Sequence, residues 1–195
     1  MSRFSRSRGK ILLHLDGTEF ELFQRSVTEL VDLLDDGAGE PLAHDESDPF
    51  SVWEASFGTQ PGIEDDFADE ERDPIMQRLF PRAYPDDPEA AGDFARFTEA
   101  SQRQDKISCA CTVLDDLDGL RGGAGRIPHD HVDAWLKTLN NIRLVLSVML
   151  GISDEISSAE AAQRPDSDPR SWLHTYYGWL GWMLESLLEC VMAPE

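Results

Sequence analysis

The 195-residue sequence predicts a mainly α-helical fold, a helical bundle with a small N-terminal β element. Three stretches, at about 18–35, 130–151 and 170–192, carry apolar residues at the spacing of one helix face. The alternation of apolar and polar residues that is typical of a strand occurs in Lys10–Leu15. A chain of this length can bury a sizeable core, so we expect a single domain over residues 1–195.

The first elements are predicted from alternation and from helix-capping patterns. Arg126-Ile127-Pro128 could form a second short strand against the strand at residues 10–15. Thr18-Glu-Phe-Glu21 is a capping-box pattern, which predicts that a helix begins there. That helix would end near Gly37, because glycine is favoured just after a helix C-terminus.

Two helices are predicted in the middle of the chain, at Asp73-Pro74 and at Asp87-Pro88. In each pair the aspartate can cap the helix and the proline fits its first turn. The first helix would end before Pro81, and the second would run towards Leu120. After the helix over 130–151 we expect a polar loop rich in Ser, Asp and Pro, up to Pro169.

The apolar face of the helix that begins at Pro88 changes side along its length. Phe94 and Phe97 define one side, whereas Ile107 and Leu114 lie nearly opposite. This helix therefore either kinks between about 101 and 106 or packs its two halves on different neighbours.

The charge is strongly acidic and unevenly placed. The chain holds 38 acidic and 17 basic residues, a formal net charge of −21. Such a surface repels nucleic-acid phosphates and anionic lipid, and it favours a protein partner with a basic surface. Residues 41–71 carry ten acids and no Lys or Arg, which predicts an acidic irregular excursion at about 37–72. Residues 1–10 are basic, and we expect them to form a solvated tail or a strand edge.

Cysteine usage and hydropathy favour a cytoplasmic protein. The chain has 3 cysteines, an odd number that argues against a secreted disulfide framework. We expect no signal peptide, because the apolar run after the basic start is only Ile11-Leu12-Leu13. We also expect no membrane span, because no apolar stretch approaches about 20 residues.

One arginine lies inside the apolar stripe of the helix over 130–151. With Leu139 as the centre of that stripe, Arg143 falls about 40° away. Because burying an unpaired guanidinium is very costly, Arg143 either holds an internal ion pair, which we favour, or presents part of the helix to a partner. We expect Asn140 and Arg143 to be the buried polar residues of this helix.

The cysteines offer a candidate thiol switch. Cys109 and Cys111 point about 200° apart if they lie on a helix, so they cannot easily bond to each other or share a metal. They are either two half-buried small residues or redox-sensitive thiols that need local unwinding or another partner such as Cys190.

His129-Asp130-His131 superficially suggests zinc, but the spacing matches no common site, and we predict no metal and no cofactor. Asp130 or His129 is expected at the helix start, as a cap or loop residue. The glycine-rich turn at 122–125 follows a helix rather than a strand, so it does not indicate a phosphate loop. No catalytic arrangement is recognisable, and we predict that the chain is not an enzyme.

The last helix carries two tryptophans away from its main apolar face. Trp179 and Trp182 lie about 120° and 180° from the centre of that face. They indicate either a central helix that is covered on most sides or an aromatic anchor for a partner or a second copy of the chain.

The chain also resembles a family, loosely over residues 10–36 and well over 73–192. The motifs that carry the resemblance are Leu79-Phe80-Pro81-x2-Tyr84-x2-Asp87-Pro88-Glu89-Ala90-Ala91, Phe94-x2-Phe97-Thr98-Glu99, Trp135-Leu136-x2-Leu139-Asn140-x2-Arg143-Leu144, Leu150-Gly151, Asp168-Pro169-Arg170 and Tyr177-x-Trp179-Leu180-x3-Leu184-Glu185-Ser186-Leu187. They are similar to an actinobacterial domain-of-unknown-function family that includes the oxidative-stress regulator (AosR-like) proteins. The resemblance implies a non-enzymatic role in oxidative-stress transcription, through a sigma factor and a thiol switch. It carries no cysteine pair over to Cys109 and Cys111, and the acidic excursion is longer than the family pattern.

Three functions follow as hypotheses. The first is a cytoplasmic regulatory protein that acts by protein–protein contact, with its acidic surface meeting a basic partner. The second is a thiol-based redox sensor in the same setting. The third, which we favour least, is a metal-dependent enzyme.

Overall fold

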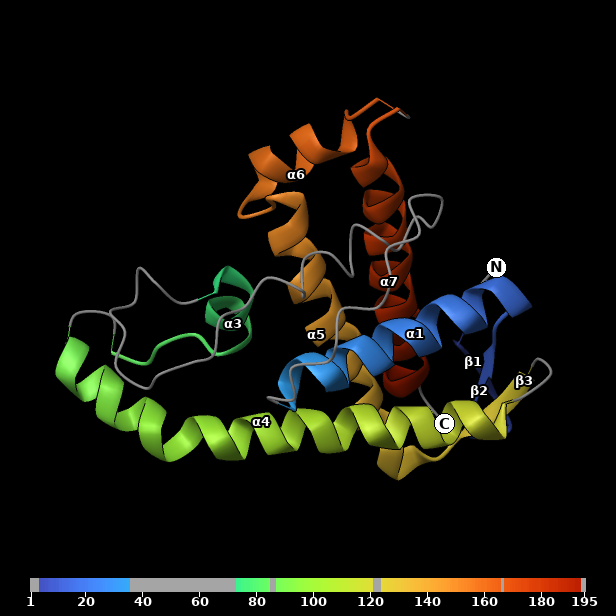
Figure 1. Ribbon diagram of the computed structural model, residues 1–195. Helices are drawn as coiled ribbons and strands as arrows, with labels where there is room; N and C mark the ends of the chain where they lie inside the picture. Colours follow the sequence, from blue (N-terminus) through green and yellow to red (C-terminus); the bar gives the residue numbers. More distant parts are fainter. Residues whose placement is uncertain (1–3, 36–72, 85–86, 121–123, 166, 194–195) are drawn as a thin grey trace.

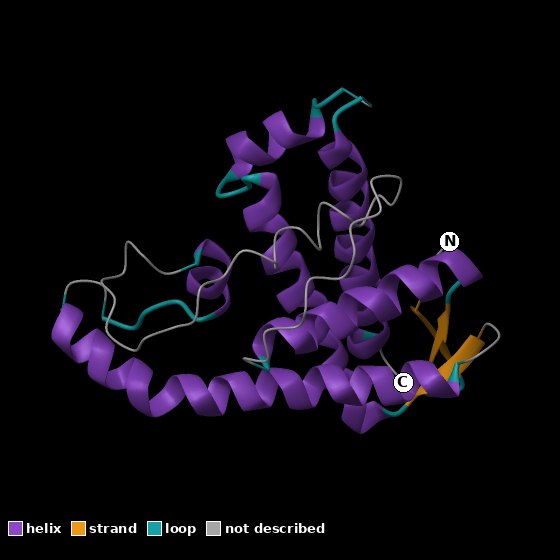
Figure 2. Cartoon of the chain, in the orientation of Figure 1, coloured by secondary structure: helices purple, strands orange, loops and turns teal. Residues whose placement is uncertain are grey.

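The computed structural model describes residues 4–35, 73–84, 87–120, 124–165 and 167–193, which form a helical bundle beside a small sheet (Figures 1 and 2). The mainly α fold with a small N-terminal β element is therefore confirmed. The acidic excursion predicted at about 37–72 and residues 122–123 of the glycine-rich turn lie outside the described residues. The helix expected to end near Gly37 ends at Leu34, with Asp35 as its C-cap residue. The elements are β1 (Phe4–Ser7), β2 (Lys10–His14), α1 (Gly17–Leu34), α3 (Pro74–Leu79), α4 (Pro88–Gly119), β3 (Ala124–Ile127), the 3-10 turn η2 (His129–His131), α5 (Val132–Leu150), α6 (Glu155–Ala162) and α7 (Pro169–Met192).

The sheet is antiparallel, in the order β1-β2-β3. The expected strand at residues 10–15 and its partner near Ile127 are confirmed, and Ile11 pairs with Ile127 across β2 and β3. Phe4–Ser7, which belong to the basic stretch of residues 1–10, form the edge strand β1, and Phe4 pairs there with Leu13. Arg8 and Gly9 make the tight turn between β1 and β2, with φ of 51° and 72°. The buried side chains of Phe4, Ile11, Leu13 and Ile127 attach the sheet to the helices.

The capping residue of helix α1 lies two residues earlier than predicted. Asp16, not Thr18, is the capping residue, and it accepts a hydrogen bond from the backbone N–H of Glu19. The Glu19 carboxylate in turn accepts from the backbone N–H of Asp16. The Thr18 prediction is wrong because Asp16 offers the same pairing to a glutamate three residues on.

Helix α4 is a single 32-residue helix that packs on α1 and α5. Its ribbon bends in the N-terminal part without losing helical structure (Figure 1). The C-terminal half buries Ala110, Val113 and Leu117, whereas Phe94 and Phe97 in the N-terminal half are exposed. The apolar face of α4 therefore changes side because its C-terminal half packs into the core, whereas the aromatic residues of its N-terminal half face solvent.

Helices α5 and α7 pack against each other and supply much of the core. Trp135, Leu139 and Leu146 of α5 are fully buried, as are Leu173 and Leu180 of α7. Helix α5 ends at Gly151, whose φ of 71° is the left-handed conformation that glycine adopts freely.

The polar loop expected between the last two helices contains the short helix α6, so that prediction is wrong. The Asp154 carboxylate accepts from the backbone N–H of Ser157, and the Ser157 hydroxyl oxygen in turn accepts from the backbone N–H of Asp154. Helix α6 buries only Ala161, so its sequence has no apolar periodicity to reveal it. The helices in the described ranges are all too short or too polar to cross a membrane.

Candidate functional site

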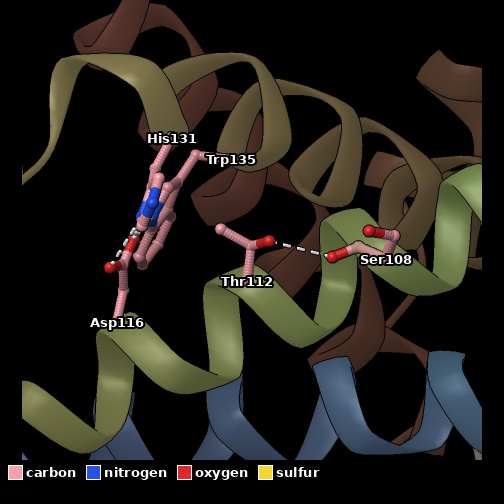
Figure 3. A network of polar contacts seen from close by, with 5 residues as sticks. All are labelled: Ser108, Thr112, Asp116, His131 and Trp135. Atoms are coloured by element: carbon pink, nitrogen blue, oxygen red, sulfur yellow. Dashed lines mark hydrogen bonds and ion pairs between the residues drawn. The ribbon is translucent and has the colours of Figure 1, made fainter.

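A polar network fixes the start of α5 against α4 and was not foreseen from the sequence. Asp116 of α4 accepts a 2.8 Å hydrogen bond from the indole Nε1 of the fully buried Trp135. The same carboxylate lies 3.0 Å from Nδ1 of His131, as Figure 3 shows. One turn earlier, the Thr112 hydroxyl donates to the Ser108 carbonyl at 2.9 Å. The network gives Trp135 the acceptor that a buried indole needs.

The histidine motif makes no side-chain cap. His129–His131 form the 3-10 turn that leads into α5, so His129 and Asp130 lie at the helix start as turn residues, one of the two roles expected for them, and neither side chain caps the helix. His131 is instead held by Asp116. Within the described ranges, no group of three or more His, Cys, Asp or Glu residues could hold a metal ion.

The three cysteines occupy different environments and are not in disulfides. Cys109 is half-buried and Cys111 is exposed, both on α4, while Cys190 is buried on α7. Burial raises the pKa of the Cys109 and Cys190 thiols above the usual value. A raised pKa lowers the thiolate fraction at neutral pH, and the thiolate is the form that reacts with oxidants. The redox role of these cysteines stays a prediction.

Trp179 belongs to an aromatic cluster between α1 and α7. Its ring stacks on Tyr176 with centroids 5.5 Å apart and meets the Phe23 ring edge-on at 6.2 Å. Phe23 in turn stacks on Trp135 at 5.6 Å. Trp179 and Trp182 are both half-buried, which fits a central helix covered on most sides. Their role as partner anchors stays a prediction.

The buried polar residues of α5 differ from those expected. Asn140 is exposed, so the prediction that it is buried is wrong. The neighbouring Asn141 is buried instead, and its Oδ1 accepts a 3.2 Å hydrogen bond from Lys106 Nζ. One residue along the helix turns the amide by about 100°, from solvent towards α4.

Arg143 is half-buried, but its partner is a ring and not a carboxylate. The guanidinium carbon lies 4.7 Å from the centre of the Tyr177 ring of α7, a cation–π contact. Among the described residues no acidic side chain pairs with Arg143, so the ion pair expected for it is not found in that part of the chain. Nε of Arg143 is buried and has no hydrogen-bond partner there.

Three exposed aromatic side chains lie at and just before the N-terminal part of α4. We call Tyr84, Phe94 and Phe97 the aromatic tip; their exposed fractions are 57%, 41% and 85%. The Tyr84 and Phe94 rings meet edge-on with centroids 5.9 Å apart. The sequence already indicated the aromatic tip, because Phe94 and Phe97 lie on a different side of the helix from the apolar residues that its C-terminal half buries.

Comparison with known proteins gives one family and a small set of similar regulators. Residues 1–191 match the family described as "Domain of unknown function (DUF2017)". The chain is 27% identical over 189 residues to the "Oxidative stress regulator AosR" of Mycobacterium bovis and to the same-named protein of Mycobacterium tuberculosis H37Rv. Each alignment covers 91% of this chain and 80% of the relative. No solved structure matches the chain.

Proposed function

Because the chain belongs to the DUF2017 family, we propose that it is a non-enzymatic regulatory protein of an oxidative-stress response that acts by protein–protein contact. The name of the mycobacterial relatives supports the regulatory part, since these proteins are called oxidative stress regulators and align along 91% of this chain. The proposed place of action is the cytoplasm.

The observation that carries the contact mechanism is the aromatic tip. A Phe side chain that is 85% exposed gains nothing from the protein's own core, and Phe97 is such a residue. Large rigid aromatic side chains are effective anchors in protein interfaces, because they bury much area at a small entropic cost. Phe94 and Tyr84 extend the same apolar surface and support each other by their edge-on contact.

The net charge supports a partner of opposite sign. A chain with a formal charge of −21 repels a second copy of itself and attracts a basic surface. We propose a basic region of a sigma factor as the partner, and contact with DNA through that partner only. A homodimer is the competing arrangement, and the experiment below distinguishes it.

The test measures binding of the purified chain to each sigma factor of its own organism, by titration at about 50 and 300 mM salt. We expect one sigma factor to bind, more weakly at the higher salt. Phe97→Ser should weaken that binding about tenfold, because it removes an aromatic anchor. Ile156→Ser is the matched control, since Ile156 is 72% exposed but lies on α6.

Two results would overturn the proposal. One is the absence of binding to every sigma factor at low salt. The other is self-association of the chain at the same concentrations, abolished by Phe97→Ser, which would assign the aromatic tip to a homodimer.

A further inference from the structure

A cavity of about 260 Å³ lies between α5, α7, α3 and the start of α6. It is lined by two arginines, Arg143 and Arg78, together with the polar side chains of Asn140, Ser153 and Ser158 and the ring of Tyr177. Two cations at one cavity are unexpected in a chain whose acidic residues outnumber its basic ones by 38 to 17. The cavity lies away from the aromatic tip, on other elements.

Arg143 is held in a fixed orientation with donors left over. Its guanidinium stacks on the Tyr177 ring, at 4.7 Å from the ring centre. On α7, a Cβ at Gly181 would lie 3.5 Å from the guanidinium carbon, an ordinary van der Waals distance, so the flat group packs beside this face of the helix. Nε is buried without a hydrogen-bond partner among the described residues. Leaving a buried charged donor unpaired is costly, which indicates that an acceptor is missing from this surface.

Asp154, the acid among the described residues that line the cavity, already has hydrogen-bond partners. Asp154 lines the cavity, but its carboxylate accepts from both the backbone N–H and the hydroxyl of Ser157, each at 2.8 Å. These hydrogen bonds hold the pKa of Asp154 below its usual value, so it stays ionised as the cap of α6. Arg78 is exposed on α3 and, like Arg143, forms no ion pair with another described residue. The cavity therefore keeps an excess of positive charge.

We propose that this cavity binds a small organic anion through a carboxylate or phosphate group, which accepts hydrogen bonds from Arg143 and Arg78. A guanidinium presents a planar set of donors that matches both groups. Asn140, Ser153 and Ser158 supply neutral hydrogen-bonding groups for the rest of the ligand. The volume lies just below the range of about 300–1,000 Å³ that is usual for drug-sized ligands, so the ligand is small. The inference does not depend on the proposed regulatory function.

The test is a thermal-shift and calorimetric titration of the full chain with inorganic phosphate, succinate and glycerol 3-phosphate. Sodium chloride at the same ionic strength is the reference, because salt alone screens the net charge. At least one of the three anions should raise Tm in a saturable way, with a Kd below about 10 mM. A response to phosphate and glycerol 3-phosphate alone identifies a phosphate ligand, and a response to succinate alone identifies a carboxylate ligand.

Two variants connect binding to the arginines. Arg78→Ala should weaken the binding about tenfold without lowering Tm in chloride, since Arg78 is exposed. Arg143→Met keeps an apolar contact with Tyr177 and removes the unpaired donor, so it should fold and lose the anion response. Arg96→Ala is the matched control, because it removes an exposed arginine from the distant part of α4.

The proposal is overturned if none of the three anions raises Tm beyond chloride. It is also overturned if Arg143→Met retains the full response, or if Arg96→Ala reduces the affinity as much as Arg78→Ala does. Amide NMR shifts give a second measurement, in which the bound anion should perturb Ser153 and Ser158 before residues of α4.

Discussion

Asp116 shows how a single side chain can determine the junction of two helices. It lies near the C-terminal end of α4, with a side chain that is 10% exposed, and accepts a hydrogen bond from Trp135 while it holds His131. The indole of Trp135 also packs edge-on against Phe4, at 5.6 Å between centroids. A substitution at Asp116 would therefore affect the packing of both the helices and the sheet, because the Trp135 ring contacts both.

We expect Asp116→Ala to lower the free energy of unfolding by about 2 kcal/mol, because it leaves the buried Trp135 Nε1 without an acceptor. Urea denaturation at pH 7 measures the change. Asp115→Ala removes the same charge from an exposed position on the same helix and should change the free energy of unfolding by less than about 0.5 kcal/mol. Equal losses in the two variants would contradict the role given to the hydrogen bond.

The cysteines are predicted to react in the order of their accessibility. With a limiting amount of iodoacetamide or peroxide at pH 7, Cys111 should be modified before Cys109, and Cys190 last. Peptide mass spectrometry after quenching measures the order. A disulfide between Cys109 and Cys111 in the folded protein would contradict this prediction, since both lie on the continuous helix α4 and point in different directions.

At the scale of elements, long helices were predictable and short or polar features were not. The helices that contain Phe23, Trp135 and Leu180 follow from apolar periodicity, because each buries one face against the others. Helix α6 buries only Ala161, so no periodic pattern reveals it. The Asp116 network joins residues of two helices, and nothing in a single sequence states which polar side chains will meet across such a contact.

The cap of α6 gives a prediction with a definite pH dependence. Hydrogen bonds from Ser157 lower the pKa of Asp154 below its usual 3.8 in the folded protein. The stabilisation is therefore complete above about pH 4, and it is lost as the pH falls through the lowered pKa. Asp154→Ala should be less stable than the wild type at pH 7, and this difference should shrink below pH 4.

Chemical denaturation at pH 7, 5 and 3.5 measures the difference. Glu160→Ala, an exposed change near the other end of α6, is the control and should show no such pH dependence. A difference for Asp154→Ala that stays constant down to pH 3.5 would show that the carboxylate does not act as the cap.

At the scale of the whole molecule, the dominant physical property is the formal charge of −21. Charges of one sign repel each other in the compact state more than in the unfolded chain, so they destabilise the fold. Arg6 of β1 counteracts the repulsion at one place, because it donates to the backbone carbonyls of Cys190 and Ala193 and so caps the end of α7.

We expect Tm to rise by about 3–5 °C between about 20 and 200 mM NaCl at pH 7, because salt screens the repulsion. Thermal unfolding followed by circular dichroism measures the shift. At pH 5 the effect should be smaller, since part of the carboxylates carry protons there. A Tm that falls with salt at pH 7 would mean that attractive ion pairs outweigh the net repulsion.

The unbroken helix α4 has a consequence for how this chain can diversify. At about 1.5 Å per residue, its 32 residues reach about 48 Å, from beside the sheet out to the aromatic tip. Leu117 at one end is constrained by the core, whereas Phe97 near the other end is free of it. Substitutions at the outer end of α4 can therefore change which molecules this surface recognises, at little cost in folding stability.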